Sequence, residues 1–107
     1  MSLVKISDYS EAPSAETGKK IHLEHPWTHI DYVLALFNAE GKYYVIADLC
    51  TKCGGSLGNG LLRGLFAVCS TEECLWSIKK GYCKFDHTSV MPTYKVVEQE
   101  DGLFIEI

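Results

Sequence analysis

Two close pairs of cysteines constrain this chain more than any other feature of its sequence. The first pair is a CxxC at Cys50 and Cys53, within "DLCTKCGGSLGNG", and the second is a CxxxxC at Cys69 and Cys74. Fifteen residues separate the two pairs, and glycine is dense around them. A segment that runs out from one loop and returns in the other would bring the four thiols together.

Three uses of such thiols are open at this stage. A redox dithiol of the thioredoxin kind needs its CxxC at the start of a helix, but the Gly-Gly-Ser-Leu-Gly that follows Cys53 opposes a helix. Buried cysteines also serve as small hydrophobic residues, although four in two spaced pairs are less typical of that use. Two close pairs on separate loops suit a metal centre, because they can supply four thiolates to a tetrahedral ion or to an iron–sulfur cluster.

The rest of the sequence indicates one all-β domain over residues 1–107. With 107 residues, 47% of them apolar, the chain can bury a single modest core. The apolar residues come in short runs rich in Val, Ile, Tyr and Phe, separated by turn signals, and they do not recur at helical spacing. This pattern predicts seven strands, at 20–24, 32–37, 42–47, 65–69, 75–79, 94–98 and 103–107.

Two hairpins are expected among these strands. One has its turn at 38–41 and the other has a turn that ends at Asp101-Gly102, because Glu-Gly and Asp-Gly steps supply the positive φ that tight hairpin turns need. Strands this short and numerous are typical of a small antiparallel sandwich or a partly open barrel. The cysteine-rich middle third, about 48–83, is then an inserted subdomain of two loops.

Charge and apolar patterning exclude two classes of partner. Ten basic and fourteen acidic residues give a formal charge of −4, which offers no surface for a phosphate backbone. No apolar run approaches the roughly 18 to 20 residues that span a bilayer, and "MSLVKISDYSEAPS" lacks the hydrophobic stretch of a signal peptide. We therefore expect a soluble, cytoplasmic protein that binds neither nucleic acid nor membrane. Five cysteines in such a setting favour metal or redox chemistry over disulfides.

From Asp48 to Trp76 the sequence resembles the Rieske-type ferredoxins and related Rieske domains. The cluster motif of that family is CxH, a spacer of about sixteen residues and CxxH, commonly with "GG" and "L" after the first half and an aromatic residue after the second. Here "CTKCGGSLGNG" aligns Cys50 with the first cysteine, and "VCSTEECLW" aligns Cys69 with the second. "YYVIADLC" and "MPTYKVVEQEDGLFIEI" resemble the strand that enters the first loop and the closing hairpin, so the resemblance covers about residues 3–107.

The resemblance fails at both histidine ligands. Lys52 stands at the first histidine position, and Glu72 stands at the second. If Trp76 is matched to the aromatic residue of the second half, Cys74 takes the place of the histidine, and Cys53 could serve likewise in the first loop. The resemblance then implies a Rieske-like fold with four cysteine ligands: Cys50, Cys53, Cys69 and Cys74.

The resemblance implies a small electron carrier that passes one electron from a flavoprotein reductase to an oxygenase or another terminal enzyme, and that itself catalyses no bond-making step. Its cofactor would be a [2Fe–2S] cluster. The same four thiolates also suit Zn²⁺ or a single iron, because their spacing is also that of a zinc ribbon. The competing interpretation is an accessory or binding subunit with such an ion or with an empty site, as in the small subunits of assimilatory nitrite reductases.

Several neighbouring side chains have expected roles. Leu57, Trp76 and Tyr82 are expected to shield the centre from water, and Cys83 is expected to be a packed thiol and not a ligand. Lys52 and two glutamates place charges of both signs at the tip of the inserted subdomain. We interpret these side chains as exposed to solvent, and the alternative is a docking patch for redox partners.

The four histidines are expected at ordinary surface or core positions. His25 and His29 lie within "IHLEHPWTHI", where Pro26 breaks the turn that would align them as a metal pair, and His22 precedes them. His87 follows the second loop and could approach the centre, but the sequence gives it no specific role.

Overall fold

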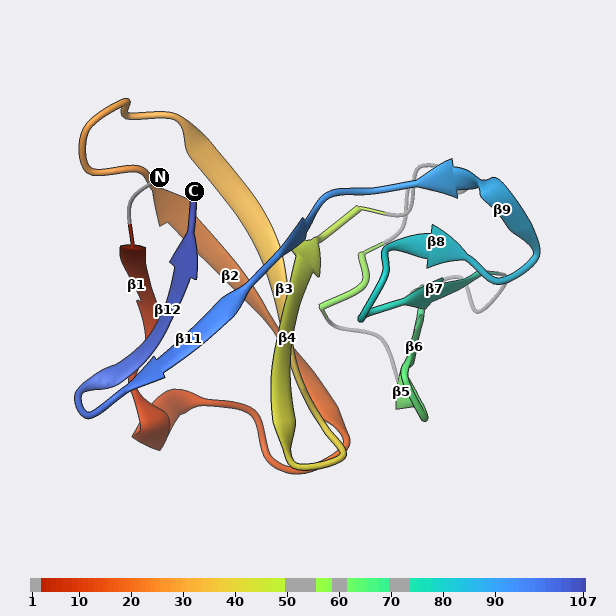
Figure 1. The fold of residues 1–107 in the computed structure, drawn as a ribbon, viewed down its shortest axis with the longest axis horizontal. Helices are drawn as coiled ribbons and strands as arrows, with labels where there is room; N and C mark the ends of the chain where they lie inside the picture. Colours follow the sequence, from red (N-terminus) through yellow and green to blue (C-terminus); the bar gives the residue numbers. More distant parts are fainter. Residues whose placement is uncertain (1–2, 50–55, 59–61, 70–73) are drawn as a thin grey trace.

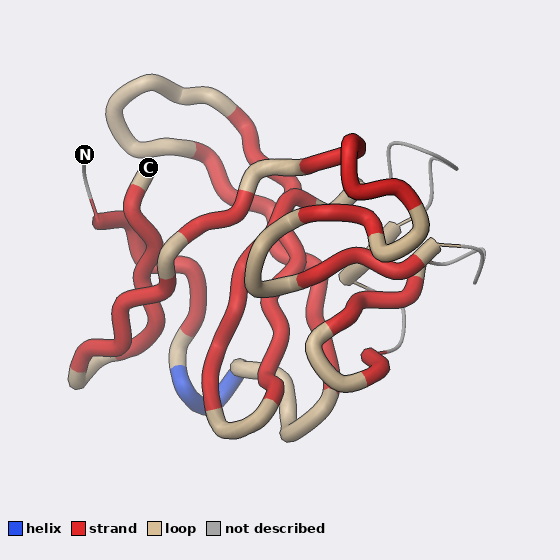
Figure 2. The backbone as a smooth tube through the Cα atoms, turned by 45° about the vertical axis from the view of Figure 1, so that its right-hand side comes forward, coloured by secondary structure: helices blue, strands red, loops and turns tan. Residues whose placement is uncertain are grey.

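The computed structural model describes residues 3–49, 56–58, 62–69 and 74–107, which form a molecule built almost entirely of strands (Figures 1 and 2). Within these residues the only helix is a single 3₁₀ turn, η1 (Tyr9–Glu11). No helix in the described part of the chain has the length and apolar character needed to cross a bilayer. The described strands are β1 (Leu3–Ser7), β2 (Thr17–Glu24), β3 (Asp31–Ala39), β4 (Lys42–Ala47), β5 (Leu62–Arg63), β6 (Phe66–Val68), β7 (Leu75–Ser77), β8 (Tyr82–Cys83), β9 (Asp86–Val90), β10 (Thr93–Tyr94), β11 (Val96–Gln99) and β12 (Gly102–Glu106).

These strands form three antiparallel sheets. Their strand orders are β1-β12-β11, β10-β4-β3-β2 and β5-β6-β7-β8-β9. Figure 1 shows the four-stranded sheet in the middle, with the three-stranded sheet on its left and the five-stranded sheet on its right. We call the first two sheets the β core, and we call β5 to β9 with the loops around them the loop subdomain. The predicted all-β core with an inserted subdomain is confirmed.

The central strand β3 is buried on both of its faces. Leu34, Ala35, Leu36 and Phe37 are consecutive, and each is at most 1% exposed. Because successive residues of a strand point to opposite faces, an unbroken buried run requires cover on both sides of the sheet. Leu34 and Leu36 belong to a cluster that includes β12, whereas Ala35 and Phe37 belong to a cluster that includes β6 and β7. The central sheet is therefore the middle layer of three.

Both predicted hairpins are present. Ala39 pairs with Lys42 and leaves Glu40 and Gly41 as a two-residue turn. Their φ angles of 52° and 78° are both positive, as a tight turn that matches the twist of its strands requires. The second hairpin joins β11 to β12 and places Asp101-Gly102 at its turn, as expected.

The predicted strand at 94–98 is instead two strands in different sheets. Tyr94 of β10 pairs with Val45 in the central sheet, and Val96 of β11 pairs with Ile105 in the three-stranded sheet. Lys95 lies at the point where the chain passes from one sheet to the other. An apolar pattern indicates which residues are buried but not which strand they pair with. The sequence therefore could not predict that the chain passes from one sheet to another here.

The loop subdomain differs most from its prediction. The strands expected at 65–69 and 75–79 are shorter, as β6 and β7, and β5, β8 and β9 were not expected. Strands of two or three residues carry too little pattern to be recognised, because their formation depends on neighbouring strands. The five-residue β9, with the sequence DHTSV, has Val90 as its only aliphatic residue and so shows no apolar run. The edge strand β1 of the β core was also not expected.

Candidate metal centre

Cys69 and Cys74 lie opposite each other on neighbouring chain segments of the loop subdomain. Cys69 follows β6 and Cys74 precedes β7, whose register pairs Val68 with Leu75. The amide of Cys69 donates a hydrogen bond to the carbonyl oxygen of Cys74 at 3.1 Å, which extends that register by one more pair. The two cysteines of the second pair thus lie side by side, and whether the first pair joins them stays a prediction.

The chemistry of this pair fits two ligands of one metal centre. Directly opposed residues of an antiparallel pair carry their Cβ atoms about 4.5 to 5.5 Å apart on the same face. Two thiolates at that separation can reach one metal ion at a sulfur–metal distance of about 2.3 Å. Cys69 is 1% exposed and Cys74 is 8% exposed, so a centre bound here would be largely shielded from water.

Two of the three expected shielding residues pack with this pair. Leu57 and Trp76 are each 0% exposed and belong to the same core cluster as Cys69 and Cys74. Tyr82 is half-buried, and its ring meets that of Phe66 edge-on, with 6.4 Å between the ring centroids. The apolar surroundings expected around the second ligand loop are therefore present.

The first cysteine pair falls outside the described residues. Cys50 and Cys53 lie there, as do Lys52 and Glu72, which the sequence resemblance aligns with the two histidine ligands. Among the residues that the structure does describe, no three His, Cys, Asp or Glu side chains are grouped to hold a metal ion. The assembly of all four thiols therefore remains a prediction.

Asp48 closes the base of the first loop, a role that the cysteine pattern did not suggest. Ser56 Oγ donates to both carboxylate oxygens, at 3.0 and 2.9 Å. The amide of Leu57 donates to Oδ1 at 2.9 Å, and the amide of Gly58 donates to the same oxygen. Because a buried carboxylate is costly unless hydrogen-bonded, this side chain, 1% exposed, holds residues 56–58 beside the end of β4.

The same contacts fix the first loop against β2. Lys20 Nζ lies 3.7 Å from Asp48 Oδ2 and places a positive charge beside the buried carboxylate. A Cβ atom on Gly58 would lie only 2.8 Å from the Cα atom of Lys20, so the loop approaches the strand at backbone distance. An aspartate before the first cysteine, followed by Ser-Leu-Gly after the second, is the sequence signal that could have identified this closure.

The fifth cysteine lies in the core, as expected of a packed thiol. Cys83 is 1% exposed and pairs in register with Trp76. It belongs to the same core cluster as Cys69 and Cys74. Cys83 therefore serves as an internal control for the chemistry assigned to those two cysteines.

The histidines near the first hairpin have local roles. His25 is 6% exposed, and its Nδ1 accepts hydrogen bonds from the amides of Trp27 at 3.2 Å and Thr28 at 3.3 Å. His29 is exposed, with Nδ1 3.7 Å from Glu24 Oε1, and His22 is exposed on β2. The backbone of His87 lies in β9. The buried histidine thus orders the loop between β2 and β3.

Comparison with solved structures identifies the class of fold. No protein-family model matches the chain, and no curated protein matches it in sequence. The chain is similar to a protein described as a nitrite reductase (NADPH) small subunit, with a TM-score of 0.79, 16% identity and 100% of both chains covered. It is also similar to a ferredoxin of Sphingomonas yanoikuyae B1, with a TM-score of 0.76, 20% identity and 99% of both chains covered.

A third similar structure comes from an assembly of two proteins. It belongs to the complex of oxygenase and ferredoxin in carbazole 1,9a-dioxygenase, and the match has a TM-score of 0.76 and 18% identity. It covers 96% of this chain and 91% of the other. Similarity over nearly the full length, together with the antiparallel β core and the inserted loop subdomain, establishes that this chain has the Rieske-like fold.

Proposed function

We propose that this chain is a small electron-transfer protein whose [2Fe–2S] cluster is ligated by Cys50, Cys53, Cys69 and Cys74. The observation that carries the proposal is the buried, opposed pair Cys69 and Cys74, packed with Trp76 at the ligand loop of a Rieske-like fold. A bound cluster supplies one-electron redox chemistry. The chain supplies the thiolates, the apolar surroundings and, through Asp48, the closure of the first loop.

Four thiolates are favoured because the residues at the histidine positions are poor ligands for such a cluster. A lysine ammonium binds no metal until it loses its proton, and carboxylates suit harder ions. Lys52 and Glu72 therefore cannot replace the histidines of a Rieske centre. Four thiolates give the cluster more negative charge than two thiolates and two imidazoles, so its reduction potential should fall toward the roughly −400 mV of plant-type clusters.

The proposed partners are a flavoprotein reductase as electron donor and an oxygenase or another terminal enzyme as acceptor, in the cytoplasm. Support for such partners comes from the similarity to a structure of an oxygenase–ferredoxin complex. In this role the protein carries electrons and catalyses no bond-making step by itself.

The test is an absorption spectrum with metal and sulfide analysis of protein purified without oxygen. The proposal expects a red-brown protein with visible charge-transfer bands, two irons and two sulfides per chain. A colourless protein with one zinc per chain would refute the electron-carrier function.

A second candidate is an accessory subunit that carries Zn²⁺, a single iron or no metal. The specific observation in its favour is the similarity to a nitrite reductase small subunit, which has the highest TM-score of the comparisons given above. The same metal and sulfide analysis separates the candidates, because only a [2Fe–2S] cluster contains acid-labile sulfide.

A further inference from the structure

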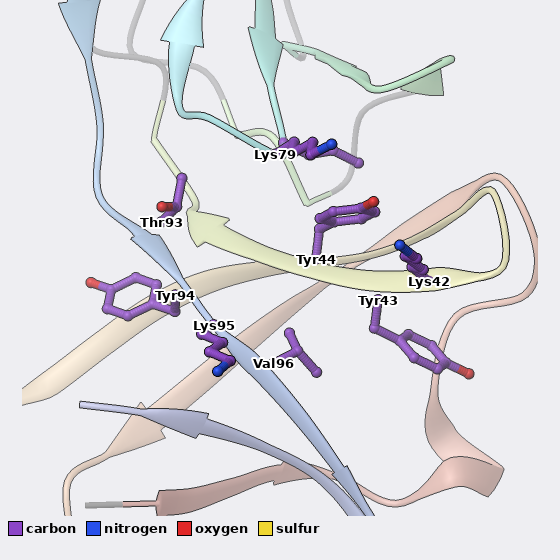
Figure 3. Close-up of a pocket in the computed structure, with 9 residues that line it drawn as sticks. Lys42, Tyr43, Tyr44, Lys79, Thr93, Tyr94, Lys95 and Val96 are labelled. Carbon is purple, nitrogen blue, oxygen red and sulfur yellow. The ribbon is translucent and has the colours of Figure 1, made fainter. Parts of the chain in front are cut away.

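A groove of about 600 Å³ lies between β4, the junction of β10 with β11 and the turn after β7 (Figure 3). Of the described residues, three lysines and three tyrosines contribute to its lining and no carboxylate does: Lys42, Lys79, Lys95, Tyr43, Tyr44 and Tyr94. In Figure 3, Lys79 faces Tyr44 from the opposite side, and Lys42 lies beside that tyrosine. None of the three cysteines that the structure describes lines the groove.

The groove is basic in a protein whose net charge is −4. Lys42, Lys79 and Lys95 are exposed, and within the described residues none of them forms an ion pair. Three cations without a paired anion create a local positive potential that attracts anionic groups. Tyr94, which is half-buried beside Tyr32, adds an aromatic ring to the lining.

The groove also contains an unpaired strand edge. β10 pairs with β4 only at Val45 and Ile46, so in the described chain Lys42–Tyr44 have a strand partner on one side only, which is β3. The strand β10 does not continue along this edge, because after Lys95 the chain enters β11 of the three-stranded sheet.

The N–H and C=O groups of successive residues in β4 point alternately toward β10 and toward β3. The amide of Ala47 donates toward the β10 side, to the carbonyl of Pro92, and the amide of Asp48 donates toward β3, to the carbonyl of Val33. Counting back in steps of two from Ala47 places the N–H and C=O of Tyr43 on the β10 side, facing the groove. An unpaired edge of this kind can accept another strand.

We propose that this groove binds a short, extended, acidic segment of a partner protein. The segment adds as a strand to the edge of β4 at Tyr43, and its carboxylates pair with Lys42, Lys79 and Lys95. Charge complementarity determines the acidic character of the segment, and the backbone edge determines its extended conformation. Within the described residues, the groove shares no lining residue with the pair Cys69 and Cys74.

The test uses a capped, fluorescein-labelled peptide of alternating glutamate and valine, with anisotropy measured on the full-length protein. Binding is expected to weaken as salt is added, and the amide of Tyr43 is expected to shift in NMR spectra and to exchange more slowly. Lys79→Glu should weaken binding about tenfold. Lys80→Glu changes an exposed neighbour that does not line the groove and should have a much smaller effect.

A peptide with alternate backbone amides N-methylated keeps the charge and removes the hydrogen bonds that add a strand. It should bind at least about tenfold more weakly than the unmodified peptide if the edge of β4 is used. Equal binding of the two peptides, equal effects of Lys79→Glu and Lys80→Glu, or complete competition by millimolar inorganic phosphate would each overturn the proposal. Absence of binding at low salt would do the same, and no readout depends on the bound metal.

Discussion

The β core and the loop subdomain share an apolar cluster but differ in the length of their strands and in the interactions that close their loops. In the β core, β2 and β3 pair over eight residues, and β3 buries side chains on both faces. In the loop subdomain the strands are only two to five residues long, and the first loop is closed by the hydrogen bonds of Asp48. Apolar packing thus supports both regions, and the second depends in addition on the polar closure at Asp48 and on the proposed metal ligands.

The largest expected effect is loss of the metal centre when a ligand in the second loop is removed. Cys69→Ser and Cys74→Ser keep the size of each side chain but remove a thiolate, so neither variant should retain the wild-type metal content. Metal and sulfide analysis after anaerobic purification measures this directly. Circular dichroism should still show the β core, because β2, β3 and β4 do not depend on the metal.

The matched control for these variants is Cys83→Ala. Cys83 lies in the same core cluster and is equally buried, but it is assigned a packing role. This variant should keep its metal and lose only about 1 kcal/mol of stability. Full metal retention in Cys69→Ser, or metal loss in Cys83→Ala, would contradict the ligand assignment.

A smaller effect, on stability alone, is expected from truncation in the β core. Leu36 is 0% exposed, so Leu36→Ala should lower the free energy of unfolding by about 2 to 5 kcal/mol. Leu65→Ala in the loop subdomain removes the same atoms from a half-buried site and should cost about 1 kcal/mol. Urea denaturation compares the two variants, and equal costs would contradict the difference in burial between the two sites.

A still smaller effect is expected at the base of the first loop. Asp48→Asn keeps the shape of the side chain but weakens its bonds to Ser56, Leu57 and Gly58, at a cost of about 2 kcal/mol. The variant should also release its metal to a chelator faster than the wild type does. Asp8→Asn, at an exposed pair with Lys5, should change stability by less than about 0.5 kcal/mol. If Asp48→Asn released its metal at the wild-type rate, the hydrogen bonds of Asp48 would not contribute to holding the metal centre.

The sequence predicted most of the β core, because its strands are long enough for apolar runs to show. The run from Leu34 to Phe37 and the turn at Glu40-Gly41 indicated the hairpin that became β3 and β4. The change of sheet at Lys95 was missed, since burial on either side of it is similar and only the partner strand changes.

Prediction of the candidate site was less complete. The spacing of Cys69 and Cys74 identified a pair that the structure places in opposed, buried positions. Asp48 was missed because its importance comes from donors eight to ten residues further along the chain, which only the folded loop brings to the carboxylate.

The measurement that tests the central claim most directly is the reduction potential of the purified protein as a function of pH. Four thiolate ligands predict a potential well below −150 mV, near the roughly −400 mV of plant-type clusters, because the cluster carries more negative charge than a Rieske centre. They also predict little change between pH 6 and 9, about the range where histidine ligands would titrate. A potential above about −150 mV, or one that falls steeply with pH near neutrality, would contradict ligation by four cysteines.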